Sequence, residues 1–303
     1  MAPVSLARTR SISPHIIHNE DIIRHLYDSG FQAGNYADTL LHVHQNSYRL
    51  HAIILSRSPY LVHLMSTSPP SGSGQRVIHV DLEQEPEVTR EGFAIALGYL
   101  YSSVSLSLLR PENARGVLAA ARLLGGLDDL CAYAYDACRH SITLDTIDEW
   151  LDFIGRIPSP DGTTTPDFHP ASSIFGLYAQ QLRDDVFHFL VVALPSALDI
   201  HRPPGIVQDE NPQGGRNILL KVFARVPFDL FKAAVESPDF QIGSEQARFK
   251  FAKDAIEFRK RGVARGAGAE ETVVLAFGGA SAAGSVVHVT RKLRKKPLWK
   301  VST

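Results

Sequence analysis

A strand–turn–strand pattern near residue 45, set among helical patterns, constrains the fold of this chain most strongly. The run TLLHVH, residues 39 to 44, alternates apolar and polar positions and puts Leu41 and Val43 on one face of a strand. Residues 48 to 50 continue as a second strand after a turn at 45 to 47, and VIHVDL, residues 77 to 82, alternates in the same way. We therefore predict a small sheet within an α+β fold.

Three histidines in this region, His42, His44 and His51, raise the question of a metal site. His42 and His44 share one face of the first strand. A structural metal needs three or four converging ligands with a supporting second layer of hydrogen bonds, and the sequence places neither a cysteine nor an acidic partner beside them. We predict solvent-facing strand residues and no metal.

The segment before the hairpin has the pattern of a short helix. Asn19 is suited to cap its start, and Gly30 is suited to end it. The apolar face of this predicted helix consists of Ile22, Ile23, Leu26 and Tyr27. A helix of about ten residues is marginal in water by itself, so this face must be buried somewhere.

Helical patterns also fill most of the remaining chain. One runs from about 88 to 101, a second from 111 to the glycines at 125 and 126, and a third continues through Cys131 and Cys138, which we predict to be packed in the core. Further on, Ser244 can cap a helix that ends in basic residues before Gly262. Its predicted inward stripe is Phe251, Ala255 and Phe258. The segments TVVLAF and SVVHVT then have the composition of strands joined by a hairpin turn.

Composition and charge limit the class of protein. With two cysteines, no signal-peptide pattern and no apolar run of about 18 residues, the chain is expected to be intracellular, in the cytoplasm or the nucleus, and not to span a membrane. Residues 245 to 303 hold 13 Lys plus Arg against 5 Asp plus Glu, a charge of +8, whereas the rest holds 18 against 27, a charge of −9. Two interpretations stay open: a basic face neutralised by the acidic body, or an import or nucleic-acid patch at residues 291 to 300.

No motif for catalysis or cofactor binding is evident. The chain lacks a Gly-x-Ser-x-Gly elbow, an HExxH helix, a Cys-x-x-Cys pair and the dinucleotide-binding glycine fingerprint. The glycine-rich run at 278 to 285 lacks the Lys-Ser/Thr ending of a phosphate-binding loop. We expect no catalytic residue and no cofactor.

The order of GNYADTLLHV, YRLHAIILSRSPYL, VIHVDL and FAIALGYLYSS resembles the BTB/POZ family over roughly residues 15 to 142. In that family an acidic residue precedes the hairpin, a histidine opens a helix leading to a serine, and an aromatic pair ends a later helix. The positions that match are Asp38, His51, Leu55, Ser58, Tyr60, Tyr99 and Tyr101. The resemblance implies that His51 is a structural residue at the start of a helix.

The second half resembles the helical extension that follows BTB domains in filamentous-fungal proteins, through segments such as LYAQQLRDDVFHFLVVALPSAL. We therefore expect a leader at 1 to 14, a BTB/POZ domain at 15 to 142, a helical extension at 143 to 262, and a C-terminal β-hairpin with a basic tail at 263 to 303. Two Pro/Gly-rich stretches, 157 to 170 and 201 to 216, are predicted loops and candidates for partner contact.

The resemblance implies action through surfaces. Family members commonly dimerise through their first helix, a role that suits Ile22, Ile23, Leu26 and Tyr27, although the same face could instead pack on its own domain. Many join a cullin-3 scaffold, so the first hypothesis is an adaptor that recruits an unknown substrate protein for ubiquitination. The second is a homo-oligomeric or nuclear scaffold without a ligase role. Repressors of the family often carry Arg or Lys where this chain has Ala52, which weakens a repressor-type role. No DNA-reading motif is evident, so we do not expect nucleic acid as a partner.

Overall fold

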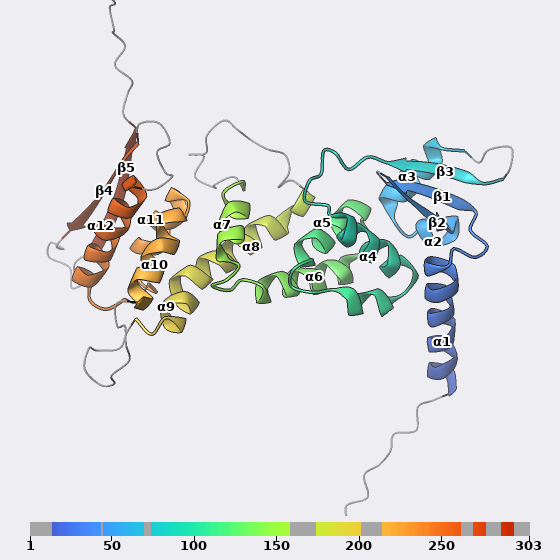
Figure 1. The fold of residues 1–303 in the computed structure, drawn as a ribbon, viewed down its shortest axis with the longest axis horizontal. Helices are drawn as coiled ribbons and strands as arrows, with labels where there is room; N and C mark the ends of the chain where they lie inside the picture. The colour runs from blue at the N-terminus through green and yellow to red at the C-terminus, as the bar shows by residue number, and fades with distance from the viewer. Residues whose placement is uncertain are drawn as a thin grey trace, which may run out of the picture. The chain divides into compact units, whose positions relative to one another are not determined.

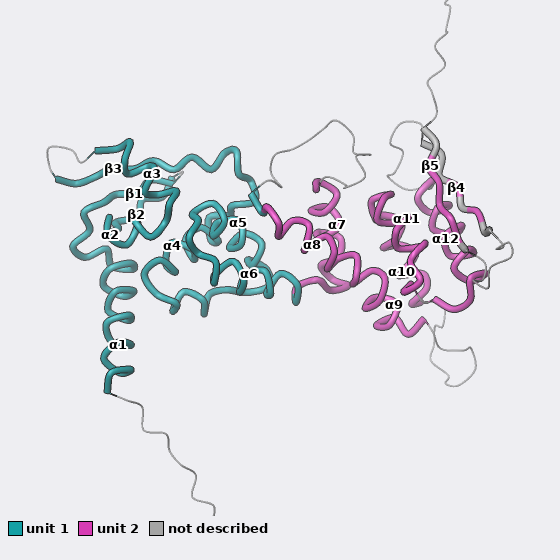
Figure 2. Tube along the Cα trace, turned by 180° about the vertical axis from the view of Figure 1, so that it is seen from behind, with its two compact units in different colours: residues 1–140, 170–175 teal, residues 141–169, 176–303 magenta. Residues whose placement is uncertain are grey.

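The protein is described by a computed structural model in which the chain forms two compact units (Figure 2). Unit 1 comprises residues 1–140 and 170–175, and unit 2 comprises residues 141–169 and 176–303. The residues that the structure describes are 14–43, 45–69, 74–157, 174–200, 214–240, 242–261, 269–276 and 286–293. Most of the predicted leader and of the two predicted loops, and the tail beyond 293, lie outside them.

The N-terminal helix is longer than the sequence pattern predicts. Helix α1, Pro14–His25, begins at a proline, whose fixed φ suits the first turn of a helix, and continues as a π-helical segment, Leu26–Gln32. Asn19 is therefore inside the helix and Gly30 does not end it. The chain stays helical past Gly30 because Tyr27 and Phe31 pack there against unit 1, with ring centroids 5.5 Å apart.

The predicted hairpin is part of a three-stranded mixed sheet in unit 1 (Figure 1). Strand β1, Thr39–Val43, pairs antiparallel with β2, Asn46–Leu50, and parallel with β3, Arg76–Val80, in the order β2-β1-β3. Leu41 and Val43 are buried and His42 is on the more exposed face, which confirms the predicted alternation. His44 lies outside the described residues.

The other regular elements that the structure describes in unit 1, apart from α1, the π-helical segment and the three strands, are helical. They are α2, Ala52–Leu55; α3, Pro59–Thr67; α4, Arg90–Tyr101; a 3-10 turn, Ser103–Leu108; α5, Ala114–Leu124; and α6, Asp128–His140. Helices α4 and α5 approach closely because both present glycine: a Cβ on Gly92 would lie 2.3 Å from the carbonyl carbon of Gly116. Helix α5 ends at Leu124, followed by Gly125 with φ of 68°, as the sequence predicts.

Unit 2 consists of helices followed by a β-hairpin. The elements are α7, Ile147–Ile154; α8, Leu177–His188; a π-helical segment, Phe189–Ala193; α9, Leu194–Ala197; α10, Gly214–Arg225; α11, Phe228–Glu236; α12, Glu245–Arg261; β4, Ala269–Ala276; and β5, Val286–Leu293. Strands β4 and β5 pair antiparallel. Phe223 is at the core, with Phe240 stacked on it and Phe251 edge-on to it at centroid distances of 5.1 and 5.2 Å. The predicted α+β class, a small sheet with helices and a mainly helical extension, is confirmed.

The predicted inward stripe of α12 needs one correction. Phe251 and Ala255 are fully buried, but Phe258 is 42% exposed and Arg259 is buried in its place. Positions 251, 255 and 259 are four residues apart and share one helix face. The Arg259 guanidinium donates to the carbonyls of Phe223 and Val226 at the end of α10, 3.2 and 2.6 Å away. These acceptors make an arginine suitable at an inward position.

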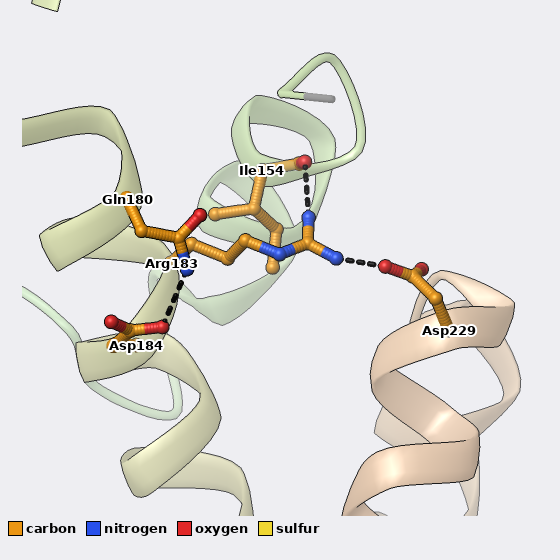
Figure 3. Close-up of polar contacts among 5 residues, drawn as sticks. All are labelled: Ile154, Gln180, Arg183, Asp184 and Asp229. Atoms are coloured by element: carbon orange, nitrogen blue, oxygen red, sulfur yellow. Dashed lines mark hydrogen bonds and ion pairs between the residues drawn. The ribbon is translucent and has the colours of Figure 1, made fainter. Parts of the chain in front are cut away.

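A second buried arginine, Arg183, holds three helices of unit 2 together (Figure 3). Its guanidinium donates to the carbonyl of Ile154 at the end of α7, over 3.3 Å, and forms an ion pair with Asp229 in the first turn of α11. Gln180 and Asp184 bond to each other on the exposed side of α8. Because Arg183 is 4% exposed, this ion pair is of the buried kind, in which loss of one partner is costly.

Candidate interaction surface

Helix α1 presents an apolar surface that its own unit leaves uncovered. None of its twelve residues is buried, and Figure 1 shows the helix extending away from the sheet and helices of unit 1. The large apolar side chains exposed along it and at the residue that follows are Ile16, Ile17, Ile22, Ile23 and Leu26, with exposed fractions from 50% down to 36%. Sequence reasoning identified the last three and missed Ile16 and Ile17, because it started the helix at Asn19.

Tyr27 does not belong to this surface, which corrects its predicted place in the apolar face. It is 4% exposed and its ring lies beside Phe31, while its Cε2 is within 3.2 Å of the position that a Cβ on Gly98 would occupy. The π-helical turn that starts at Leu26 rotates Tyr27 inward, and helical periodicity does not anticipate such a turn. We call Ile16, Ile17, Ile22, Ile23 and Leu26 the α1 face.

Three of the positions that carry the family resemblance meet at the start of α2. The Asp38 carboxylate accepts from the backbone N–H of Ala52 over 2.7 Å and from the Thr39 hydroxyl over 2.9 Å. Asp38 therefore caps α2 from another segment, because the cap residue His51 makes no side-chain bond to the helix.

His51 joins three segments of the chain through its backbone and its side chain. Its backbone N–H donates to the Tyr101 hydroxyl oxygen over 2.9 Å, its Nδ1 lies 3.0 Å from that hydroxyl, and its Nε2 lies 2.8 Å from the carbonyl oxygen of Asn35. A carbonyl only accepts, so Nε2 carries the proton, and the Tyr101 O–H donates to Nδ1. Tyr101 is 4% exposed, and burial raises its pKa well above the ordinary value, so the hydroxyl remains a donor. The histidine is therefore a structural residue in this fold. We call the hydrogen bonds of His51 to Tyr101 and Asn35, together with that of Ala52 to Asp38, the clasp.

The other matched positions have separate surroundings. Ser58 is fully buried, donates to the Leu124 carbonyl over 2.5 Å and caps α3 by accepting from the N–H of Leu61. Leu55 is fully buried in the core. Tyr60 and Tyr99 are half-buried, and burial raises the pKa of each phenol.

Sequence reasoning missed two residues beside the clasp, Tyr36 and Ile53. Tyr36 is 93% exposed and Ile53 is 76% exposed. Tyr36 has a φ of 60°, and the nearby Gly34 has a φ of 62° with its missing Cβ only 2.7 Å from the Cβ of Arg49. The Gly-Asn pair at 34 and 35 was an available signal for an unusual turn, but it does not report exposure.

The thiols and histidines show no arrangement for chemistry in the described part of the chain. Burial raises the pKa of Cys131 to about 11 and that of Cys138 to about 12, which makes both thiols poor nucleophiles at neutral pH. The rings of His42 and His79 stack at 5.0 Å on adjacent strands, but among the described residues no group of three or more His, Cys, Asp or Glu could hold a metal ion. No described helix has both the length and the apolar character needed to cross a membrane.

Comparison with known proteins identifies one informative similarity. No family model matches the sequence. The chain is 28% identical over 285 residues to the BTB/POZ domain-containing protein 2 of Schizosaccharomyces pombe, an alignment that covers 92% of this chain and 90% of that protein. The α+β fold with its helical extension and this similarity along nearly the whole length agree with the resemblance of the sequence to BTB/POZ proteins, and they support a role as a protein-interaction module.

Proposed function

We propose that this protein is a homodimeric adaptor. Two copies associate through the α1 face, unit 1 binds a cullin-3 scaffold, and unit 2 recruits a substrate protein for ubiquitination. The observation that carries the dimer is the α1 face itself: a twelve-residue helix without a single buried residue, bearing large apolar side chains. Such a helix is marginal in water unless another surface covers it.

The energy available from this face follows from its exposure. Fully burying a large aliphatic side chain contributes about 1.5 to 3 kcal/mol, and the five side chains are 36% to 50% exposed. Covering them therefore contributes about 3 to 7 kcal/mol per copy, roughly twice that for a symmetric pair. Association costs about 4 to 15 kcal/mol. The free energy from covering the α1 face in both copies is therefore of the same size as the cost of association.

The choice of a cullin scaffold as partner rests on the resemblance of the chain to the BTB/POZ family. The surroundings of Asp38 favour an adaptor role over a repressor role. This carboxylate already accepts hydrogen bonds from the Ala52 N–H and the Thr39 hydroxyl at the start of α2. In the repressor type, a basic residue at position 52 lines a charged pocket, and here an alanine fills that position. The recruiting surface would lie in unit 2, the helical extension.

The dimer is tested by light scattering of the full chain across concentration, for wild type and Ile23→Asp. Ile23 is 39% exposed, so aspartate is tolerated in a monomer but not in an apolar interface. We expect a dimeric wild type and a monomeric variant. Leu177→Asp is the matched control, because Leu177 is 84% exposed in unit 2. Equal masses for wild type and Ile23→Asp would refute the role of α1.

The adaptor role is tested by affinity capture with the N-terminal domain of cullin-3 at low salt. Retention of the scaffold by wild type supports the proposal. A blank result with an intact dimer leaves a homo-oligomeric scaffold as the function, and the next experiment then follows the location of a tagged chain that lacks residues 291 to 300. Loss of nuclear accumulation in that deletion would assign import to the basic tail.

A further inference from the structure

The lysines of this chain are confined to its last part. Residues 1–220 hold 15 arginines and no lysine, whereas residues 221–303 hold 7 arginines and 9 lysines. A preference for arginine throughout the chain does not explain this change, because lysine outnumbers arginine in the second stretch. Unit 1 and the helices α7 to α9 therefore carry no side-chain amine.

The contacts of several unit 1 arginines do not require a guanidinium. At four positions the arginine side chain is exposed and forms no hydrogen bond or ion pair with any residue that the structure describes. These positions are Arg24, Arg49, Arg90 and Arg110. Lysine carries the same charge and has nearly the same helix propensity, so folding does not select between the two residues there. What differs is reactivity, because a lysine amine can lose its proton and be acylated, whereas the guanidinium stays protonated.

Helix α12 gathers three of the lysines on one exposed face. Lys250, Lys253 and Lys260 are exposed, and their spacings of three and seven residues return to the same side of a helix. They span about 15 Å along the helix axis. None of them bonds to a residue that the structure describes, whereas Arg248 and Arg259 of the same helix are buried and donate to carbonyls. We call these three lysines the α12 lysine face.

We propose that the chain itself accepts ubiquitin on the α12 lysine face, and that the absence of lysine keeps the transfer away from unit 1; this inference rests on the proposed adaptor function. Ubiquitin on unit 1 would cover surface that the scaffold and the second copy need. Ubiquitin on α12 leaves unit 1 unmodified.

The transfer needs only an amine and an activated ubiquitin. The neutral Nζ of a lysine attacks the thioester carbonyl that joins the C-terminal glycine of ubiquitin to a cysteine of a conjugating enzyme. The C–N bond of an isopeptide forms and the C–S bond breaks. The sulfur leaves as a thiolate and takes up the proton that the amine loses. A protonated guanidinium offers no such lone pair, so the arginines of unit 1 do not react.

The test is ubiquitin transfer to the full chain by a purified cullin-3 ligase and its conjugating enzyme, with the acceptor residues mapped by mass spectrometry. The loss variant is Lys250→Arg with Lys253→Arg and Lys260→Arg, which keeps the charge and the helix propensity. We expect wild type to carry ubiquitin on the α12 lysine face and the loss variant to lose most of its conjugates. Lys221→Arg with Lys232→Arg is the matched control, because both lysines are exposed in unit 2, and it is expected to keep the wild-type amount.

A gain variant tests the lysine-free unit 1. It combines Arg49→Lys, Arg90→Lys and Arg110→Lys, three exposed positions without a bonded partner among the described residues. We expect new conjugates at the introduced lysines. If these stay unmodified while α12 is modified, position and not lysine content protects unit 1, and that part of the inference is wrong.

The outcomes separate this inference from the proposed function. A chain that does not retain cullin-3 at low salt overturns the adaptor function and this inference with it. A chain that retains cullin-3 but forms no conjugates, or forms them equally in the loss variant, overturns the inference alone. Loss of conjugates in a variant whose melting temperature is unchanged, with the matched control unaffected, supports it.

Discussion

Removing the Tyr101 hydroxyl is the sharpest test of the clasp. Phenylalanine keeps the ring, which packs against Phe31 at a centroid distance of 5.3 Å, and it opens no cavity. It removes the acceptor for the His51 backbone N–H and the donor to His51 Nδ1. Both groups then depend on water that reaches a half-buried histidine.

The magnitude follows from what is left unpaired. Two hydrogen bonds contribute about 0.5 to 1.5 kcal/mol each, and an unsatisfied buried partner costs about 1 to 3 kcal/mol. Because His51 is half-buried, water recovers part of this loss. We expect Tyr101→Phe to lower the free energy of unfolding by about 2 kcal/mol.

The assay combines urea unfolding, followed by circular dichroism, with hydrogen exchange of peptides that cover residues 51 to 55. Exchange at the start of α2 is expected to accelerate, because the His51 amide loses its acceptor. Tyr99→Phe, two residues earlier on α4, is the matched control and removes a half-buried hydroxyl from other surroundings. A Tyr101→Phe variant that matches Tyr99→Phe in both measurements would refute the clasp.

Three further outcomes are expected. Arg259→Met leaves the carbonyls at the end of α10 without this donor and is expected to lower the stability of unit 2 by about 2 to 4 kcal/mol in urea unfolding followed by tryptophan fluorescence. Gly116→Ala puts a Cβ 2.2 Å from the Thr89 hydroxyl, which caps α4, and is expected to cost about 2 to 4 kcal/mol in the same assay followed by circular dichroism. Cys131 and Cys138 are expected to resist alkylation at pH 8 until the chain unfolds.

The two cysteines also give a pH dependence with a defined sign. Their folded pKa values, about 11 and about 12, are above the ordinary value of 9.0, so the folded state holds protons that the unfolded state releases. Their contribution to stability is complete below pH 9 and is lost as the pH rises through 11 to 12. A unit 1 that becomes more stable between pH 9 and 11 would contradict this assignment.

Matched variants show whether burial and close packing cause the losses of stability expected for Arg259→Met and Gly116→Ala. Gly30→Ala places a Cβ no closer than 3.4 Å to Tyr101, so it is expected to be neutral or slightly stabilising in a helical context like that of Gly116→Ala. Arg225→Met removes an arginine that is half-exposed and paired with Asp148, and such a pair contributes at most about 1 kcal/mol. If Arg225→Met cost as much as Arg259→Met, burial of the guanidinium would not be the cause.

The predictions that succeeded depend on short stretches of chain. Alternation placed Leu41 and Val43 in the core, and Gly125 marked the end of α5. Ser244 caps α12, accepting from the N–H of Ala247 over 3.2 Å. Caps and periodicity act within a few residues, so the sequence contains all the information that these features need.

The errors come from packing over longer distances. The sequence pattern predicts the end of the first helix at Gly30, but Tyr27 and Phe31 hold the segment helical beyond it by packing within unit 1. Hydrophobicity favours Phe258 as the third residue of the inward stripe of α12, whereas the carbonyls at the end of α10 favour Arg259. A buried arginine is stable only where acceptors converge, and no local pattern shows where they are.

The sequence by itself determined the fold class, the order of elements and the existence of an apolar N-terminal helix, because periodicity and capping are local. The tertiary structure decided that His51 meets Tyr101, fifty residues further along, and that the α1 face is left uncovered while Tyr27 is not. Which polar atoms meet and which apolar side chains remain in water depend on how distant segments pack, and that packing is fixed only when the whole unit folds.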